Sequence, residues 1–306
     1  MTHIVIVGDR ESGKTTFLAL LYAAQVKSGS GTSDAFRFHA AIESLDEISD
    51  AFQQLMSGSF PDSATKEGIR GITFHLGYRK AGLGVLTRLL SRGWTPGASA
   101  SLHFILVRNL EEEMALFHRG SSLANAALRD VLESDAVVII VDSSKLGVTD
   151  ETRQLGLMGR YDAAVESLLT ALQRLRISGK GKALHPIFVF SKFDSVDPAA
   201  LRAAQVEGEP PEIRRAGPRA AYAEALLNYN LPRTMARVRN REPQRLPFAK
   251  SSFFFSSVRA EPATADRKAK VRLRTSRGVG WEPDYSTDEY LGLLERFWRI
   301  ATIARE

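Results

Sequence analysis

Residues 8–16 read Gly8-Asp9-Arg10-Glu11-Ser12-Gly13-Lys14-Thr15-Thr16, and they follow the apolar run Ile4-Val5-Ile6-Val7. The pattern Gly-x4-Gly-Lys-Thr between a strand and a helix is typical of a phosphate-binding loop. Its glycines let the backbone turn tightly, so that successive N–H groups face phosphate oxygens at a helix N-terminus that favours anions. We expect Lys14 to reach the outer phosphates and the Thr15 hydroxyl to bind Mg2+. The stretch therefore predicts binding of a nucleoside triphosphate.

Apolar runs alternate with helical patterns along the rest of the chain. Strands are expected at 4–7, 72–76, 102–107, 136–142, 187–190 and 253–255, and helices at 16–26, 40–56 and 161–177. A last helix opens with the capping box Ser286-Thr287-Asp288-Glu289, and the Pro and Gly content of 198–218 predicts a linker or inserted loop. Continuous apolar strands between helices predict an α/β three-layer sandwich, with a mostly parallel sheet of about six strands and helices on both faces.

The composition of the chain excludes several kinds of chemistry. The 306 residues are 44% hydrophobic and 25% charged, which is ordinary for a globular protein, and none is cysteine. Disulfides, thiolate metal sites and cysteine nucleophiles are therefore excluded. No apolar run approaches the roughly 20 residues that span a bilayer, and the start lacks the basic region of a signal peptide. These features predict a cytoplasmic protein.

Two later turns indicate which base the protein binds. Ser191-Lys192-Phe193-Asp194 follows one predicted strand, and Ser256-Ser257-Val258 follows another. On these residues and the phosphate loop, the chain resembles the Ras-like small GTPase superfamily as an enlarged and divergent member. In that family an [N/T/S]-K-x-D element reads guanine and a Ser-Ala-x element supports it. A carboxylate can accept two hydrogen bonds from the guanine ring N–H and its exocyclic amine, donors that adenine does not present in that arrangement.

The resemblance implies a role for each residue of the two turns. Asp194 reads guanine, Lys192 lays its alkyl stem along the base, and the Ser256–Ser257 backbone donates to the guanine carbonyl, with Val258 as the next residue of the nucleotide-binding turn. Ser191 stands where Asn is commoner, which predicts a weaker tie to the phosphate loop. The expected cofactors are GTP or GDP and Mg2+.

The resemblance also implies a switch segment and a third magnesium-site element. Thr65, with Ser63 as a substitute, is expected to close over Mg2+ and the γ-phosphate. The D-x-x-G element expected after strand 102–107 is absent, because Val107 or Arg108 stands at the aspartate position. The water-positioning glutamine is absent too, and Glu111, Glu112 and Glu113 stand nearby. Without these groups we expect a nucleotide-dependent switch whose GTP hydrolysis is slow or needs a stimulating partner.

Two alternatives remain open at this stage. Asp142 ends the apolar strand 136–142 as a magnesium-binding Asp does in many phosphate-loop ATPases, so an ATPase or kinase is possible. A GTP-binding module without hydrolysis is the second alternative. Competition between ATP and GTP separates the first from a GTPase, and single-turnover hydrolysis separates the second.

Charge is unevenly distributed along the chain. The net charge is +6, and residues 201–280 hold 17 Lys and Arg against 7 Asp and Glu. The basic 233–277 region is either a solvated, arginine-rich insertion or a binding region for an anionic surface (lipid or nucleic acid), and protein effectors or regulators are expected as partners. We expect one Ras-like domain over 1–306, with insertions near 27–60, 80–100, 143–158, 200–250 and 260–280.

Overall fold

A computed structural model of the chain describes residues 1–28, 35–40, 45–61, 69–79, 99–107, 109–111, 114, 131, 133–147, 154–174, 183–240, 248–261, 269–276 and 280–303. Its strands are β1 (Thr2–Gly8), β2 (Ala35–Ala40), β3 (Ile69–Arg79), β4 (Ser99–Val107), β5 (Ala136–Asp142), β6 (His185–Ser191), β7 (Ser252–Phe255), β8 (Ala260–Glu261), β9 (Lys270–Val271), β10 (Leu273–Ser276) and β11 (Gly280–Pro283). Its helices are α1 (Lys14–Ser28), α2 (Leu45–Met56), α6 (Gln154–Arg174), α7 (Pro198–Ala203), α8 (Ala216–Asn230), α9 (Pro232–Arg239) and α10 (Thr287–Ile303). Two short 3₁₀ turns are η2 (Ser143–Lys145) and η3 (Phe193–Ser195).

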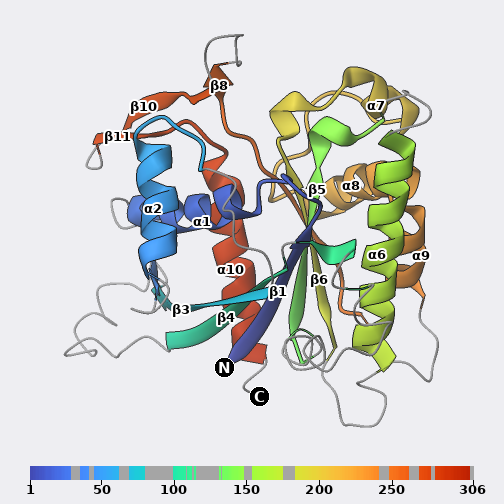
Figure 1. Ribbon diagram of the computed structural model, residues 1–306, viewed down its shortest axis with the longest axis horizontal. Helices are drawn as coiled ribbons and strands as arrows, with labels where there is room; N and C mark the ends of the chain where they lie inside the picture. Colours follow the sequence, from blue (N-terminus) through green and yellow to red (C-terminus); the bar gives the residue numbers. More distant parts are fainter. Residues whose placement is uncertain are drawn as a thin grey trace.

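Seven strands form one sheet in the order β2-β3-β4-β1-β5-β6-β7 (Figure 1). The strands from β4 to β7 in this order run parallel, β3 is antiparallel to β4, and β2 is antiparallel to β3. Parallel neighbours need crossover connections, which place helices on both faces of the sheet. The predicted three-layer α/β class is confirmed, and the sheet has one strand more than the sequence indicates.

The residues of β1 illustrate how one apolar run fills two cores. Ile4 and Ile6 belong to the core beneath α1, α2 and α10, whereas Val5 and Val7 belong to the core beneath α6 and α8. Successive strand residues point to opposite faces, so a strand covered on both sides must be apolar throughout. Figure 1 shows α1, α2 and α10 on one side of the sheet and α6, α8 and α9 on the other. The carboxyl ends of the parallel strands therefore meet at one edge, where the predicted turns lie.

The predicted start of the helix near 40–56 is wrong, because residue 40 belongs to the extra strand β2. Residues 35–40 pair antiparallel with β3, from Ala35 opposite Arg79 to Ala40 opposite Phe74, and the helix begins at Leu45. Phe36 and Phe38 alternate with polar neighbours, which is the period of a strand rather than of a helix.

The predicted linker at 198–218 is wrong at both of its ends. Pro198 begins α7, where the Asp197 carboxylate accepts a hydrogen bond from the Ala199 N–H at 2.7 Å, and Ala216 begins α8. Proline is favourable in the first turn of a helix because that turn leaves its N–H groups unpaired. The expected insertion at 200–250 thus contains α8 and α9, and the one near 80–100 lies mostly outside the described residues. The single-domain organisation stays a prediction.

The described residues 259–261, 269–276 and 280–286, here called the C-terminal hairpin segment, contain the antiparallel pairs β8–β9 and β10–β11. The Val271 N–H donates to the Gly58 carbonyl at 2.8 Å, and the Arg259 N–H donates to the Asp284 carbonyl at 2.8 Å. The segment therefore contacts both the end of α2 and the turn after β7, and Figure 1 shows β10 and β11 beside the end of α2. Among the described helices, none is long and apolar enough to cross a membrane.

Candidate nucleotide-binding site

The phosphate loop has the backbone geometry that its glycines predict. Gly13 has φ +85° and Glu11 has φ 63°, and positive φ values at alternate positions are typical of loops whose N–H groups converge on an anion. A Cβ at Gly8 would lie 2.4 Å from Ser12 Oγ and 3.2 Å from Ile140 Cβ, so any other residue there would force these neighbours to shift. Ser12 is fully buried, and its Oγ has no hydrogen-bond partner within the described part of the chain. The loop is thus a close-packed turn between β1 and α1.

Lys14 lies over this loop rather than in solvent. Its Nζ donates to the carbonyl oxygens of Gly8 at 2.8 Å and Asp9 at 2.7 Å, and the residue is only 9% exposed. The two carbonyls hydrogen-bond the buried ammonium group when no ligand is bound, so its charge is not left unsatisfied. They also hold the group at the loop, where it can contact a phosphate. Thr15 and Thr16, in the first turn of α1, are half-buried.

The turn after β6 is tied to the phosphate loop. The Ser191 hydroxyl donates to the Ser12 carbonyl at 2.8 Å, with a longer approach to the Val141 carbonyl at 3.3 Å. The predicted weakness of this tie is therefore not observed, because the two loops lie close enough for the shorter serine side chain to span them.

Lys192 connects the same turn to the end of β5. It has φ 51°, and its Nζ donates to Asp142 Oδ2 at 2.7 Å. The other Asp142 oxygen accepts hydrogen bonds from the Ser144 N–H and Oγ, and the Asp142 side chain is 1% exposed. Lys145 adds a second cation, since it donates to the Asp9 carboxylate at 2.5 Å and lies 4.0 Å from Asp142. These alternating charges join the phosphate loop to the turn after β6.

Asp194 lies next to the turn after β7, as the resemblance expects of a base-reading pair. Its carboxylate accepts hydrogen bonds from the backbone N–H groups of Asp194 and Val258, which favour the ionised form. Partial burial of the carboxyl group outweighs them and raises the pKa of Asp194 above its ordinary value of 3.8, although the residue as a whole is exposed. The Phe193 N–H also donates to the Ser256 carbonyl at 3.0 Å, which fixes the two turns against each other.

The N–H groups of the turn after β7 already have acceptors. The Ser256 N–H donates to the Phe190 carbonyl at 2.7 Å, and the Ser257 N–H donates to Ser286 Oγ at 3.1 Å. A guanine carbonyl that binds Ser257 must therefore replace the Ser286 hydroxyl. The hydrogen bonds expected of the capping box are not the ones observed. Glu289 Oε2 accepts from the Phe255 N–H at 3.0 Å, whereas a capping box would have it accept from the Ser286 N–H.

An aromatic cluster that the sequence did not predict lies beneath the two turns. Phe193, the unspecified residue of Ser191-Lys192-Phe193-Asp194, packs edge-on to Phe255 with ring centroids 4.8 Å apart. Phe190 stacks on the same Phe255 ring at 4.8 Å, and Tyr222 of α8 completes the cluster. Apolar residues at 190, 193 and 255 were visible in the sequence, but their convergence depends on the parallel pairing of β6 with β7.

The residues expected to hold Mg2+ are only partly described. Thr15 is placed in the first turn of α1, whereas Thr65, Ser63, Arg108, Glu112 and Glu113 lie outside the described residues. Val107 ends β4 as a buried apolar residue, and Leu106 just before it pairs with Ile6 of β1. Within the described residues, no group of three or more acidic or histidine side chains is placed to hold a metal.

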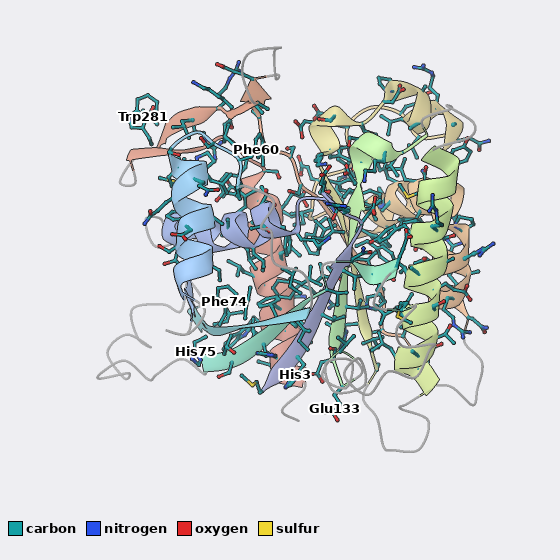
Figure 2. The ribbon with its side chains drawn as sticks, viewed as in Figure 1. His3, Phe60, Phe74, His75, Glu133 and Trp281 are labelled. Carbon is teal, nitrogen blue, oxygen red and sulfur yellow. The ribbon has the colours of Figure 1, made fainter. Side chains whose placement is uncertain are left out.

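The histidines His3 and His75 lie away from this edge. Figure 2 shows His3 and His75 at the opposite end of the molecule from Phe60 and Trp281. In the basic 233–277 region, Arg241, Arg245, Arg267 and Lys268 lie outside the described residues. Three other arginines of that region form ion pairs within the described part of the protein: Arg239 with Glu224 at 2.6 Å, Arg259 with Asp284 at 3.6 Å, and Arg274 with Glu282 at 2.9 Å.

The chain matches no protein-family model and no curated protein. Among solved structures, it is similar to a chain of the signal recognition particle receptor SRb-GTP/SRX complex from Chaetomium thermophilum, with 10% identity, a TM-score of 0.38, and coverage of 83% of this chain and 90% of that one. It is also similar to the S. cerevisiae Ski7 GTPase-like domain, bound to GDP and inorganic phosphate. That match has 13% identity, a TM-score of 0.33, and coverage of 83% of this chain and 42% of that one. Both TM-scores lie below 0.5, so neither similarity bears on the function of this chain.

Proposed function

We propose that this protein binds guanine nucleotides and acts as a nucleotide-dependent switch, with GTP hydrolysis that is slow or stimulated by a partner. One observation carries the proposal: the phosphate loop, the turn of Asp194 and the turn of Val258 are joined to one another at the carboxyl edge of one sheet. A triphosphate and its base are covalently connected, so a site for both needs these two halves side by side.

The phosphate half rests on Lys14 and the backbone of residues 8–13. Positive φ at Glu11 and Gly13 favours N–H groups that converge on an anion, and the start of α1 adds the positive end of a helix dipole. A phosphate would take over Lys14 as partner from the carbonyls of Gly8 and Asp9. Gly8 keeps the backbone close-packed enough for this loop to form.

The base half rests on Asp194. Its carboxylate lies against the Val258 N–H, where it would accept from the ring N–H and the exocyclic amine of guanine. Adenine offers no such pair of donors, so the carboxylate favours guanine. The hydrogen bond from Phe193 to Ser256 and the aromatic cluster hold this carboxylate in place.

Slow hydrolysis follows from the residues near the expected magnesium site. Phosphoryl transfer depends on Mg2+ and on a water placed in line with the leaving group. Thr15 supplies one hydroxyl ligand, Thr65 is the proposed second, and Val107 or Arg108 replaces the carboxylate of the D-x-x-G element. We expect intrinsic turnover on the order of 10⁻⁴ per second or below.

The ATPase alternative gains no support from the surroundings of Asp142. Its two oxygens bind Lys192 and Ser144, and a magnesium ion would have to displace these contacts. The salt bridge gives Asp142 a role in positioning Lys192, which needs no metal.

The test is direct identification of the bound nucleotide. The purified protein would be denatured and the released nucleotide identified by mass, before and after incubation with Mg2+. We expect GTP or GDP, with slow conversion of GTP to GDP in a single-turnover assay. Competition for a labelled guanine nucleotide is the control: displacement by ATP as efficient as displacement by GTP would contradict guanine recognition. Conversion no faster than in solution would leave a binding module without hydrolysis.

A further inference from the structure

Residues at the start of α10 contact three consecutive residues at the end of β7 and in the turn after it, two of them through backbone N–H groups. Glu289 Oε2 accepts from the Phe255 N–H at 3.0 Å, and the Tyr290 hydroxyl lies 2.6 Å from Ser256 Oγ. Ser286 Oγ accepts from the Ser257 N–H at 3.1 Å. The capping-box residues thus bind the neighbouring turn, and the last of these contacts uses the N–H expected to donate to the guanine carbonyl.

We propose that Ser286 is a specificity-determining residue of the base site, whose hydroxyl competes with the guanine carbonyl for the Ser257 N–H. The inference rests on the proposed function, because it concerns recognition of the same base. It assigns to Ser286 an effect on affinity for purines with a carbonyl at position 6, and no effect on purines without one.

The Ser286 hydroxyl can move away from the Ser257 N–H while the backbones of residues 257–259 and 284–286 stay paired. The Ser286 N–H donates to the Ser257 carbonyl at 3.2 Å, and Val258 forms a β-bridge with Tyr285. The Arg259 N–H donates to the Asp284 carbonyl at 2.8 Å. These backbone contacts do not involve the Ser286 side chain, so rotation about its Cα–Cβ bond is enough to release Ser257.

The released hydroxyl has another role available in the same position. Ser286 immediately precedes α10, and serine at that position commonly accepts a hydrogen bond from an N–H of the first helical turn. Glu289 already donates its N–H to the Ser286 carbonyl at 3.1 Å, so the backbone is arranged as at a helix start. The Ser286 hydroxyl can therefore exchange one donor, the Ser257 N–H, for another in the first turn of α10, and the competition is reversible.

Removal of the hydroxyl should strengthen guanine binding. In Ser286→Ala, the Ser257 N–H loses its protein acceptor in the nucleotide-free state, whereas the guanine carbonyl restores an acceptor in the bound state. One neutral hydrogen bond in this balance corresponds to tighter binding by about three- to ten-fold. Ser286→Asp should weaken binding, because a carboxylate holds an N–H more strongly than a hydroxyl does.

The experiment compares the dissociation constants of three nucleoside diphosphates by titration calorimetry. GDP and inosine diphosphate carry the carbonyl at position 6, and 2-aminopurine riboside diphosphate lacks it. We expect Ser286→Ala to bind the first two more tightly and the third as the wild type does. Ser286→Thr keeps the hydroxyl, and Thr302→Ala removes a hydroxyl at the far end of α10, so both should match the wild type.

Two results would overturn the inference. One is an unchanged or weaker affinity of Ser286→Ala for GDP, and the other is an equal change for all three nucleotides. Opposite shifts in the Ala and Asp variants show that both proteins are folded at the site. Failure of the proposed function has a separate signature, because the wild type would then not prefer GDP to ADP.

Discussion

Lys192 Nζ donates to Asp142 Oδ2 at 2.7 Å, so the turn proposed to recognise the base is joined by a salt bridge to the end of β5. The carboxylate is almost fully buried, whereas the lysine side chain is 39% exposed. A buried charge is stable only when it is paired and hydrogen-bonded, and Ser144 supplies the remaining hydrogen bonds to Asp142. The pair fixes the left-handed backbone at Lys192 and thereby the position of the residues that follow.

Asp142→Asn should separate a structural role from magnesium binding. The variant keeps an oxygen for Ser144 but loses the charge that pairs with Lys192, and we expect it to lower the free energy of unfolding by about 1–3 kcal/mol. Its Mg2+ concentration dependence of GTP binding should match that of the wild type. Urea unfolding and titration with Mg2+ measure the two effects. Loss of the Mg2+ dependence would instead favour the ATPase-like assignment of Asp142.

Asp194→Asn should change the preferred base from guanine to xanthine. An amide presents one donor and one acceptor where the carboxylate presents two acceptors, and xanthine carries an oxygen where guanine carries its exocyclic amine. We expect GDP affinity to fall by about ten-fold or more, on the scale of hydrogen bonds to a charged group. Competition of GDP and xanthosine diphosphate for a labelled nucleotide measures the change. An unaltered preference would show that Asp194 does not contact the base.

Guanine binding should weaken on acidification at a pH above that of an ordinary aspartate. Burial raises the pKa of Asp194, and protonation removes one of the two acceptors for guanine. Binding is therefore complete above this raised pKa and is lost as the pH falls through it. Inorganic tripolyphosphate, which has no base, is the control for protonation of phosphate and of the phosphate loop. Equal pH profiles for GDP and tripolyphosphate would contradict the assignment.

Gly8→Ala should disrupt the phosphate loop through one identifiable clash. The added Cβ would lie 2.4 Å from Ser12 Oγ, and overpacking of this kind typically costs about 1–3 kcal/mol. Thermal unfolding should show the loss, and nucleotide affinity should fall with it. Ser12→Ala removes the clashing oxygen, so the double variant should recover much of the stability. A double variant no more stable than Gly8→Ala would point to the contact with Ile140 as the cause.

Glu289→Ala should destabilise the protein more than a surface charge removal does. Glu289 pairs with Arg219, whose guanidinium also donates to the carbonyls of Phe253 and Pro211 and lies 4.7 Å from the Phe255 ring centroid. Removal of one partner leaves a buried cation, which costs about 3–5 kcal/mol. Urea unfolding measures the loss, with Glu295→Ala on the exposed face of α10 as control. If the two variants lost equal free energy of unfolding, the burial of Arg219 would not contribute to the effect of Glu289→Ala.

The strands were the most predictable part of the fold. Ile4-Val5-Ile6-Val7 and the run at 136–141 are apolar without interruption, and a strand that is buried on both faces must have apolar residues at successive positions. β2 escaped prediction although Phe36 and Phe38 alternate with polar neighbours, because the alternation is short and the pairing with β3 is a contact between segments distant in sequence. α8 and α9 escaped because proline and glycine near their starts resemble a loop, although Asp162 of α6 accepts the N–H groups of Arg233 and Thr234 and so stabilises the start of α9.

The proposed site was predictable in its residues but not in its contacts. Lys14 and Asp194 stand in patterns whose spacing can be read along the chain. The pairing of Lys192 with Asp142, and of Ser286 with Ser257, joins residues 50 and 29 positions apart. Such pairs follow from strand order and from the path of the C-terminal hairpin segment, which the sequence pattern does not define.

The C-terminal hairpin segment connects two regions that the sheet keeps apart. At one end, β9 forms a bridge with Ser59, in the stretch of chain that leads toward Thr65; at the other, Asp284 and Tyr285 pair with Arg259 and Val258, beside Asp194. Strain introduced at the base-binding turn therefore has a path of backbone hydrogen bonds to the end of α2. Because Val271 and Tyr285 on this path are buried in the core beneath α1, α2 and α10, a displacement of the base-binding turn would also shift the packing of that core.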